Sequence, residues 1–144
     1  MTKNKVIVVG AGMVGAAMAI KLAQQGKAVR IIEKKLINPQ QVLSSDQVDI
    51  RVSAINRFSE KLLDELGAMA LLKQSRLAPY QQLEAFERGG DNLLFDCADI
   101  NTTHLGHLIE NNLIQASLWQ QFEQYNIEVI EQAAPITSIE QTSD

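Results

Sequence analysis

The chain has 144 residues, a formal net charge of −4 at pH 7 and a hydrophobic content of 46%, a composition typical of globular proteins and not of disordered or membrane-spanning ones. The acidic balance disfavours nucleic acid as a partner. The single cysteine, Cys97, excludes an internal disulfide and indicates a reducing compartment such as the cytoplasm. The length suits one domain, so we expect residues 1–144 to form a single domain.

The first 33 residues predict a strand, a glycine turn, a helix and a second strand. The apolar run Val6–Val9 indicates the first strand, a stripe of small residues indicates a helix over 13–25 that ends at Gly26, and residues 27–33 indicate the second strand. A strand, turn, helix and strand in this order are typical of the ADP-binding half of a dinucleotide site.

The turn GAGMVG between the first strand and the helix has a glycine at each position where a side chain would interfere. Gly10 permits the tight turn, Gly12 lets the main chain approach a pyrophosphate, and Gly15 lets the helix pack close to the sheet. The amides of Met13 and Val14 lie at the positive end of the helix, where an anionic pyrophosphate can bind them. A glycine turn with a purely structural role is the alternative.

An acid completes this motif at the end of the second strand. Glu33 stands 18 positions after Gly15, where its carboxylate is expected to accept hydrogen bonds from the hydroxyls of the adenosine ribose. A carboxylate there would repel a 2′-phosphate, so we expect FAD or NAD as the ligand, and not NADP.

Beyond residue 33 the chain alternates between helical and extended patterns, which predicts an α/β fold. We expect a helix over 54–66, a strand pair over 83–88 and 93–96 around a glycine-rich turn, a helix over 108–125, and strands over 127–130 and 136–139.

Three further segments resemble the FAD-dependent aromatic-ring hydroxylases of ubiquinone biosynthesis. They are DIRVSAINRFSEKLLDELGAM (49–69), APYQQLEAFERGG (78–90) and HLGHLIENNLIQASLWQ (104–120). The resemblance implies an incomplete Rossmann-like FAD-binding fold with a parallel sheet and a short β-hairpin excursion. It also implies a parent monooxygenase that uses FAD, NAD(P)H as co-substrate and O2 to hydroxylate the ring of a polyprenylated phenol or quinol.

The same resemblance assigns three more residues to the cofactor. Arg51 matches an arginine that lies against the flavin nucleotide, Lys34 a basic position near the adenosine, and Asn111 a polar position at a helix start near the flavin. Independently of the family, a guanidinium can donate two hydrogen bonds at once to a pyrophosphate. A solvated surface charge is the alternative for Arg51 and for Lys34.

His104, His107 and Cys97 are the candidates for a metal site, but no third or fourth ligand stands at a fixed spacing from them. We therefore expect no metal, and no catalytic residue is assigned.

Full-length members of the family are more than twice as long, with later Asp-Gly and Gly-Asp segments and a substrate domain. The resemblance thus implies that residues 1–144 are the N-terminal part of an FAD-binding domain and do not hydroxylate a substrate alone. It places the parent in the cytoplasm, peripheral to the inner face of the membrane or associated with other enzymes of ubiquinone biosynthesis. An NAD-dependent dehydrogenase domain and a non-catalytic nucleotide-binding module remain as alternatives.

Overall fold

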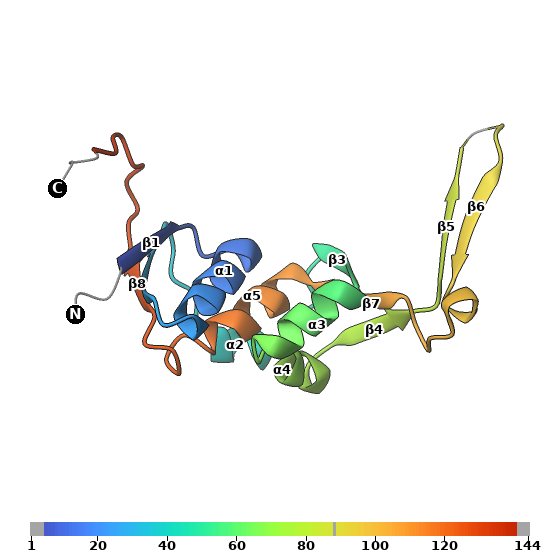
Figure 1. The fold of residues 1–144 in the computed structure, drawn as a ribbon, viewed down its shortest axis with the longest axis horizontal. Coiled ribbons are helices and arrows are strands. Elements are labelled where there is room, and N and C mark those ends of the chain that lie inside the picture. Colours follow the sequence, from blue (N-terminus) through green and yellow to red (C-terminus); the bar gives the residue numbers. More distant parts are fainter. Residues whose placement is uncertain (1–4, 88, 141–144) are drawn as a thin grey trace. The chain divides into compact units, whose positions relative to one another are not determined.

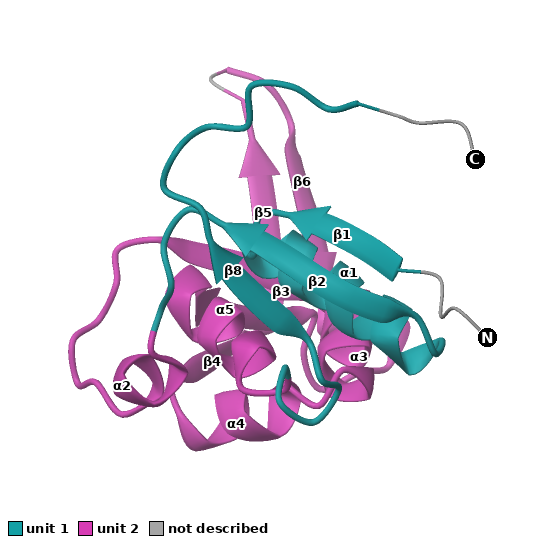
Figure 2. Cartoon of the chain, turned by 90° about the vertical axis from the view of Figure 1, so that its left-hand side faces the viewer, with its two compact units in different colours: residues 1–37, 122–144 teal, residues 38–121 magenta. Residues whose placement is uncertain are grey.

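The computed structural model describes residues 5–87 and 89–140, and the chain divides into two compact units (Figure 2). Unit 1 comprises residues 1–37 and 122–144, and unit 2 comprises residues 38–121. Each unit has its own β-sheet. No helix within the described ranges is long and apolar enough to cross a membrane.

Unit 1 is a parallel sheet with one crossover helix. Its elements are β1 (Lys5–Val9), α1 (Met13–Gln24), β2 (Ala28–Glu33) and β8 (Glu128–Glu131), and the strand order is β1-β2-β8 (Figure 1). Ala16, Ala19 and Ile20 of α1 are fully buried, as is Ile31 of β2. The three strands and the helix predicted over these residues are confirmed.

The strand expected over 136–139 is wrong, because residues 135–140 carry no regular structure. Ile139 is 87% exposed and Ile136 is 45% exposed. A strand needs a neighbour for its N–H and C=O groups, and β8 pairs only with β2 among the described strands. Apolar spacing alone does not supply that neighbour.

Unit 2 contains an antiparallel sheet, a separate hairpin and four α-helices in its described residues. The elements are α2 (Pro39–Leu43), β3 (Val52–Asn56), α3 (Arg57–Glu65), α4 (Met69–Gln74), β4 (Leu77–Tyr80), β5 (Gln82–Phe86), β6 (Asn92–Asp96), the 3₁₀ helix η1 (Cys97–Ile100), β7 (Gly106–Glu110) and α5 (Asn111–Trp119). The sheet has the order β3-β7-β4, and β5 pairs with β6 (Figure 1).

The core of unit 2 gathers around α5, which buries six of its nine residues. Leu66 and Leu72 are also fully buried. The middle strand of the sheet requires a glycine at its first residue, since a Cβ on Gly106 would lie 2.0 Å from the carbonyl oxygen of Ile55. The lack of a side chain on Gly106 therefore allows β7 to pair this closely with β3.

Both helices predicted in this region begin too early in the sequence. Residues 54–56 belong to β3, and α3 begins at Arg57, where the Asn56 side chain accepts the N–H of Ser59 at 2.9 Å as a helix cap. Residues 108–110 belong to β7, and α5 ends at Trp119. Pairing between β3 and β7 explains both errors, because it recruits residues whose apolar spacing is also compatible with a helix.

The predicted hairpin is confirmed, with β5 and β6 on either side of the turn. Gly89 in that turn has φ +82°, a conformation that favours glycine. The predicted strand end at residue 88 lies outside the described residues. The short segments α2, α4 and β4 were not predicted from the sequence.

Candidate nucleotide-binding site

The glycine turn between β1 and α1 leaves an open corner of main chain. Gly10 has φ +91°, and its N–H donates to the carbonyl oxygen of Ile32 at 2.8 Å. Gly12 caps α1 with φ −64° and ψ −179°. A Cβ added to Gly10 or to Gly12 would meet no atom within 4 Å. The space in front of both residues is therefore open to a ligand.

Gly15 has a different role, which is to let the helix approach the turn. A Cβ on Gly15 would lie 2.0 Å from the carbonyl oxygen of Gly10 and 3.6 Å from the Val8 side chain. Real Cβ atoms do not come this close to main-chain atoms, so only glycine allows the observed packing of α1. This agrees with the role predicted for Gly15.

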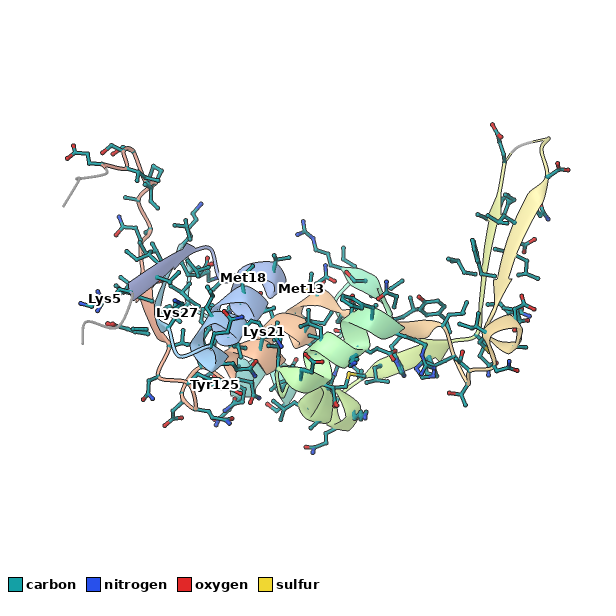
Figure 3. All side chains as sticks on the ribbon, viewed as in Figure 1. Lys5, Met13, Met18, Lys21, Lys27 and Tyr125 are labelled. Carbon is teal, nitrogen blue, oxygen red and sulfur yellow. The ribbon has the colours of Figure 1, made fainter. Side chains whose placement is uncertain are left out.

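The first turn of α1 presents main-chain donors beside the open corner. Met13, labelled in Figure 3, is the first residue of the helix, and the Val14 side chain is 80% exposed. The first N–H groups of a helix have no partner within the helix, and no acidic side chain stands in this first turn. The helix end can therefore bind an anion.

Glu33 at the end of β2 points back to the same turn. Its carboxylate accepts the N–H of Ala11 at 2.5 Å, and its other oxygen accepts the N–H of Lys34 at 2.7 Å and of Lys35 at 3.3 Å. These hydrogen bonds fix the acid beside the glycines. The side chain of Lys34 is exposed.

A hollow of about 450 Å³ lies at the carboxyl ends of the parallel strands. It is lined by Val9, Gly10, Ile32, Glu33, Lys34 and the segment 132–136. Val9 ends β1 and Glu33 ends β2, and ligands of open α/β sheets bind outside the carboxyl ends of the strands. The volume is within the range of small-molecule sites.

A second hollow of unit 1, about 520 Å³, lies at the opposite ends of the same strands. Lys5, Lys27 and Tyr125 line it (Figure 3). It contains none of the glycines of the turn and lies where the strands begin. Position relative to the strands therefore favours the hollow beside Glu33 as the nucleotide site.

Arg51 and Asn111 both lie in unit 2, where the structure brings them together. The N–H of Asn111 donates to the carbonyl oxygen of Arg51 at 2.9 Å, and the Ser53 hydroxyl donates to the Asn111 side-chain oxygen at 2.6 Å. The guanidinium of Arg51 is exposed and makes no hydrogen bond or ion pair within the described chain.

An ion pair supports the strand end that precedes Asn111. Glu110 is 5% exposed, and its carboxylate accepts from the Arg76 guanidinium at 2.8 Å and from the N–H of Asp49 at 2.7 Å. The hydrogen bonds from Arg76 hold the pKa of Glu110 below its usual range against the opposing effect of burial, and the N–H of Asp49 adds to the lowering. The carboxylate therefore stays ionised in a nearly buried position.

The sequence patterns missed two features of these sites. The segment 132–136 closes one side of the hollow beside Glu33, although it has no motif and no regular structure. In unit 2 the Asn112 side-chain oxygen is buried without a hydrogen-bond partner among the described residues, and Asn112 lines a separate hollow of about 430 Å³. The polar pair Asn111 and Asn112 at a helix start is the sequence signal for this hollow, and the family resemblance assigns only Asn111.

Comparison with known protein families agrees with the nucleotide motif. A model of the NAD(P)-binding Rossmann-like domain matches residues 8–36. This segment contains the three glycines and Glu33. The Rossmann-like part of the predicted fold is confirmed.

The chain is also similar to curated proteins over most of its length. It is 38% identical over 120 residues to 3-demethoxyubiquinol 3-hydroxylase of Escherichia coli, a match that covers 83% of this chain and 30% of that protein. It is 31% identical to the ubiquinone biosynthesis monooxygenase COQ6 of Danio rerio, over 82% of this chain and 25% of that protein. The chain thus spans less than a third of the length of these relatives.

Solved structures share the fold at lower identity. The p-nitrophenol 4-monooxygenase PnpA of Pseudomonas putida matches 99% of this chain and 34% of its own, with a TM-score of 0.70 and 20% identity. The Diels-Alderase PyrE3 matches with a TM-score of 0.69 and 19% identity, over 99% of this chain and 28% of its own. These structures show the fold alone, whereas the curated relatives show that the chain is similar to part of the ubiquinone-biosynthesis hydroxylases and monooxygenases, as its motifs indicated.

Proposed function

We propose that this chain supplies the FAD-binding portion of a flavin-dependent monooxygenase of ubiquinone biosynthesis. The parent enzyme would hydroxylate the ring of a polyprenylated phenol or quinol with NAD(P)H and O2. The observation that carries the nucleotide part is the Glu33 carboxylate held at 2.5 Å from the N–H of Ala11, beside an open glycine turn. The proposed substrate class is inferred from the names of the relatives.

FAD suits the groups that this corner offers. The open space at Gly10 and Gly12 would admit the pyrophosphate, and the N–H groups of Met13 and Val14 would donate to it. Glu33 would accept from the ribose with the lone pairs that its main-chain donors leave free. Lys34, Arg51 and Asn111 are the further residues proposed to contact the cofactor. When bound, FAD supplies the redox chemistry, while the chain binds and orients it.

An NAD-dependent dehydrogenase domain is the second candidate. It is favoured by the description of the matching family model, an NAD(P)-binding Rossmann-like domain. It would use the same glycines and the same acid, but it gives no role to Arg51 or Asn111. A non-catalytic nucleotide-binding module, the third candidate, would bind adenine nucleotides without preferring a flavin.

We propose that the chain alone does not hydroxylate a substrate. Its matched length is 30% of the Escherichia coli relative, and full catalysis needs a closed site that excludes water. Binding of the polyprenyl substrate and a peripheral position at the membrane surface, or association with other enzymes of the pathway, are proposed for the longer parent.

Equilibrium dialysis of the chain with FAD, NAD and NADP tests the assignment. We expect FAD to bind more tightly than NAD, and NADP to bind most weakly because Glu33 would repel a 2′-phosphate. Tighter binding of NAD would favour the dehydrogenase domain, whereas equal binding of FAD, NAD and ADP-ribose would favour the non-catalytic module. Turnover of a phenolic substrate by the chain would contradict its proposed inactivity.

A further inference from the structure

Unit 2 brings one carboxylate and two imidazoles together from two segments that are distant in the sequence. Glu60 lies on α3, His104 precedes β7 and His107 lies on β7. One carboxylate oxygen of Glu60 contacts Nδ1 of His107, and the other lies 3.1 Å from Nε2 of His104. The two imidazole rings have their centroids 4.6 Å apart. These are the only two histidines in the chain.

The cluster of Glu60, His104 and His107 is mostly buried but remains accessible to solvent. The side chains of Glu60, His104 and His107 are 14%, 21% and 13% exposed. A hollow of about 580 Å³, lined by all three residues and by Asp64 and Lys61, opens beside them. A ligand entering from this hollow would reach the imidazoles and the carboxylate together.

We propose that Glu60, His104 and His107 bind one divalent metal ion of the zinc class. Among the described residues, these three form the group whose ligand atoms all lie within 4.8 Å of one another. Two imidazole nitrogens and a carboxylate oxygen form a donor set that zinc accepts, with solvent in the remaining position. The hollow provides room for that fourth ligand.

One contact of the cluster already has a separation close to the one that coordination requires. Zinc bonds of about 2.0 to 2.1 Å in a tetrahedron place ligand atoms about 3.3 Å apart. The Glu60 to His104 contact of 3.1 Å is already close to this value. In the metal-free form, protons bridge the carboxylate and the imidazoles, and metal binding displaces them.

A supporting hydrogen bond fixes one of the imidazoles. The Thr103 hydroxyl lies 2.9 Å from Nδ1 of His104, while Nε2 of the same ring faces Glu60. Histidine ligands of metals commonly use one ring nitrogen for the metal and bind a neighbouring polar group with the other. Thr103 therefore orients His104 for coordination through Nε2.

Charged side chains beside the cluster also act on a cation bound there. The cationic side chains of Arg57, Lys61 and Lys73 line the same hollow and oppose a cation. Asp64 partly offsets them. The two imidazoles and the carboxylate must supply the binding energy.

The expectation of no metal rested on the lack of a third ligand at a recognisable spacing. Glu60 stands 44 positions before His104, so no local motif joins them. Only pairing of β3 with β7, which places α3 beside the histidines, brings the three together. Cys97, the other candidate in the sequence, is not part of the group.

Zinc titration of the untagged full chain, followed by proton NMR, tests the proposal. Because the chain has two histidines, its imidazole signals can be assigned with one substitution. We expect one Zn²⁺ per chain, with both histidine signals shifted at stoichiometric metal. The Cys97→Ser variant should bind equally, which excludes the thiol as the ligand.

Variants separate coordination from a structural role. His107→Gln and Glu60→Gln should abolish stoichiometric binding, and Thr103→Val should weaken it by about 10- to 100-fold as an outer-shell change. Asp64→Asn is the control for Glu60→Gln, because it also removes one negative charge from α3 and from the lining of the hollow. It should weaken Zn²⁺ binding less than Thr103→Val does. Circular dichroism checks that each variant is folded.

The proposal fails if the parent chain binds no Zn²⁺ or if Zn²⁺ leaves both histidine signals unshifted. It also fails if binding persists in Glu60→Gln and His107→Gln alike. Should Glu60→Gln not fold, the exposed Thr103→Val variant and the NMR shifts of the parent decide the question. None of these readouts depends on FAD or on hydroxylase activity.

Discussion

The carboxylate of Glu33 and the main-chain N–H of Ala11, 2.5 Å apart, join the end of β2 to the turn that follows β1. The same carboxylate accepts from Lys34 and Lys35, so main-chain donors use about three of its four acceptor sites. Glu33 thus has a structural role in addition to the role proposed toward the ribose. Any test of its contact with the cofactor must separate these two roles.

Glu33→Ala is expected to weaken FAD binding by about 10- to 100-fold, because charge-assisted hydrogen bonds contribute roughly 1.5 to 3 kcal/mol. It should also lower the free energy of unfolding by roughly 1 to 2 kcal/mol through loss of the bond to Ala11. Dialysis at a temperature where the variant is fully folded measures the first effect, and urea denaturation measures the second.

Glu131→Ala is the matched control, since Glu131 pairs in register with Glu33 on the adjacent strand and does not line the hollow. It should retain the affinity of the parent. Equal loss of affinity in both variants would mean that general charge, and not contact with the ribose, determines binding.

Gly12→Val tests the open corner with little effect on folding. The backbone of Gly12 is extended and a Cβ there meets nothing within 4 Å, so the free energy of unfolding should change by at most about 1 kcal/mol. The side chain would fill the space proposed for the pyrophosphate, and FAD binding should fall below detection. Retained binding in a folded Gly12→Val protein would contradict the assigned site.

Gly15→Ala is expected to destabilise the fold, although alanine normally stabilises a helix by about 1 kcal/mol relative to glycine. Its Cβ would lie 2.0 Å from the Gly10 carbonyl oxygen, and overpacking of this kind costs about 1 to 3 kcal/mol. Urea denaturation against Gly12→Ala checks the expectation. A Gly15→Ala protein as stable as the parent would show that α1 can shift away from the turn.

The nucleotide corner could be predicted from the sequence because its determinants are local. Gly10, Gly12 and Gly15 act within one turn, and Glu33 is separated from them by a single helix whose length fixes the register of β2. Turn chemistry also predicted the β5–β6 hairpin correctly. In both cases the chain segments that meet are adjacent in sequence.

The rest could not be predicted, because its contacts join distant segments. The β3–β7 pairing changed the expected starts of two helices, and Arg76 reaches both Glu110 and the carbonyl oxygens of Ser45 and Gln47. No periodicity in a single sequence indicates such partners. The contact between Glu60 and His104 likewise joins residues that are distant in the sequence.

Arg51→Ala is expected to weaken FAD binding by about 10- to 100-fold, with the free energy of unfolding changed by less than about 0.5 kcal/mol. The guanidinium is exposed and makes no hydrogen bond or ion pair within the described chain that its removal would break. Arg30→Ala is the control, because Arg30 forms an exposed ion pair with Glu128 at 2.7 Å. If Arg51→Ala binds FAD as tightly as the parent, Arg51 is a solvated surface charge and not a contact of the cofactor.

The ion pair between Glu110 and Arg76 predicts how stability depends on pH. Hydrogen bonds from Arg76 hold the pKa of Glu110 below its usual value. Burial opposes this effect, and the N–H of Asp49 adds to it. The negative charge of Asp46 also helps to raise the pKa of Arg76. A depressed folded-state pKa contributes stability that is fully present above the unfolded pKa of about 4.3 and is lost as pH falls through the folded value.

The free energy of unfolding of the parent should therefore fall below about pH 4.3, measured by urea denaturation from neutral pH to about pH 3. Glu110→Gln should be less stable than the parent at neutral pH and show a shallower fall in acid, because it removes the ionised partner of Arg76. The exposed Glu123→Gln should follow the parent at every pH. Parallel acid profiles of the parent and Glu110→Gln would mean that other carboxylates control the acid sensitivity.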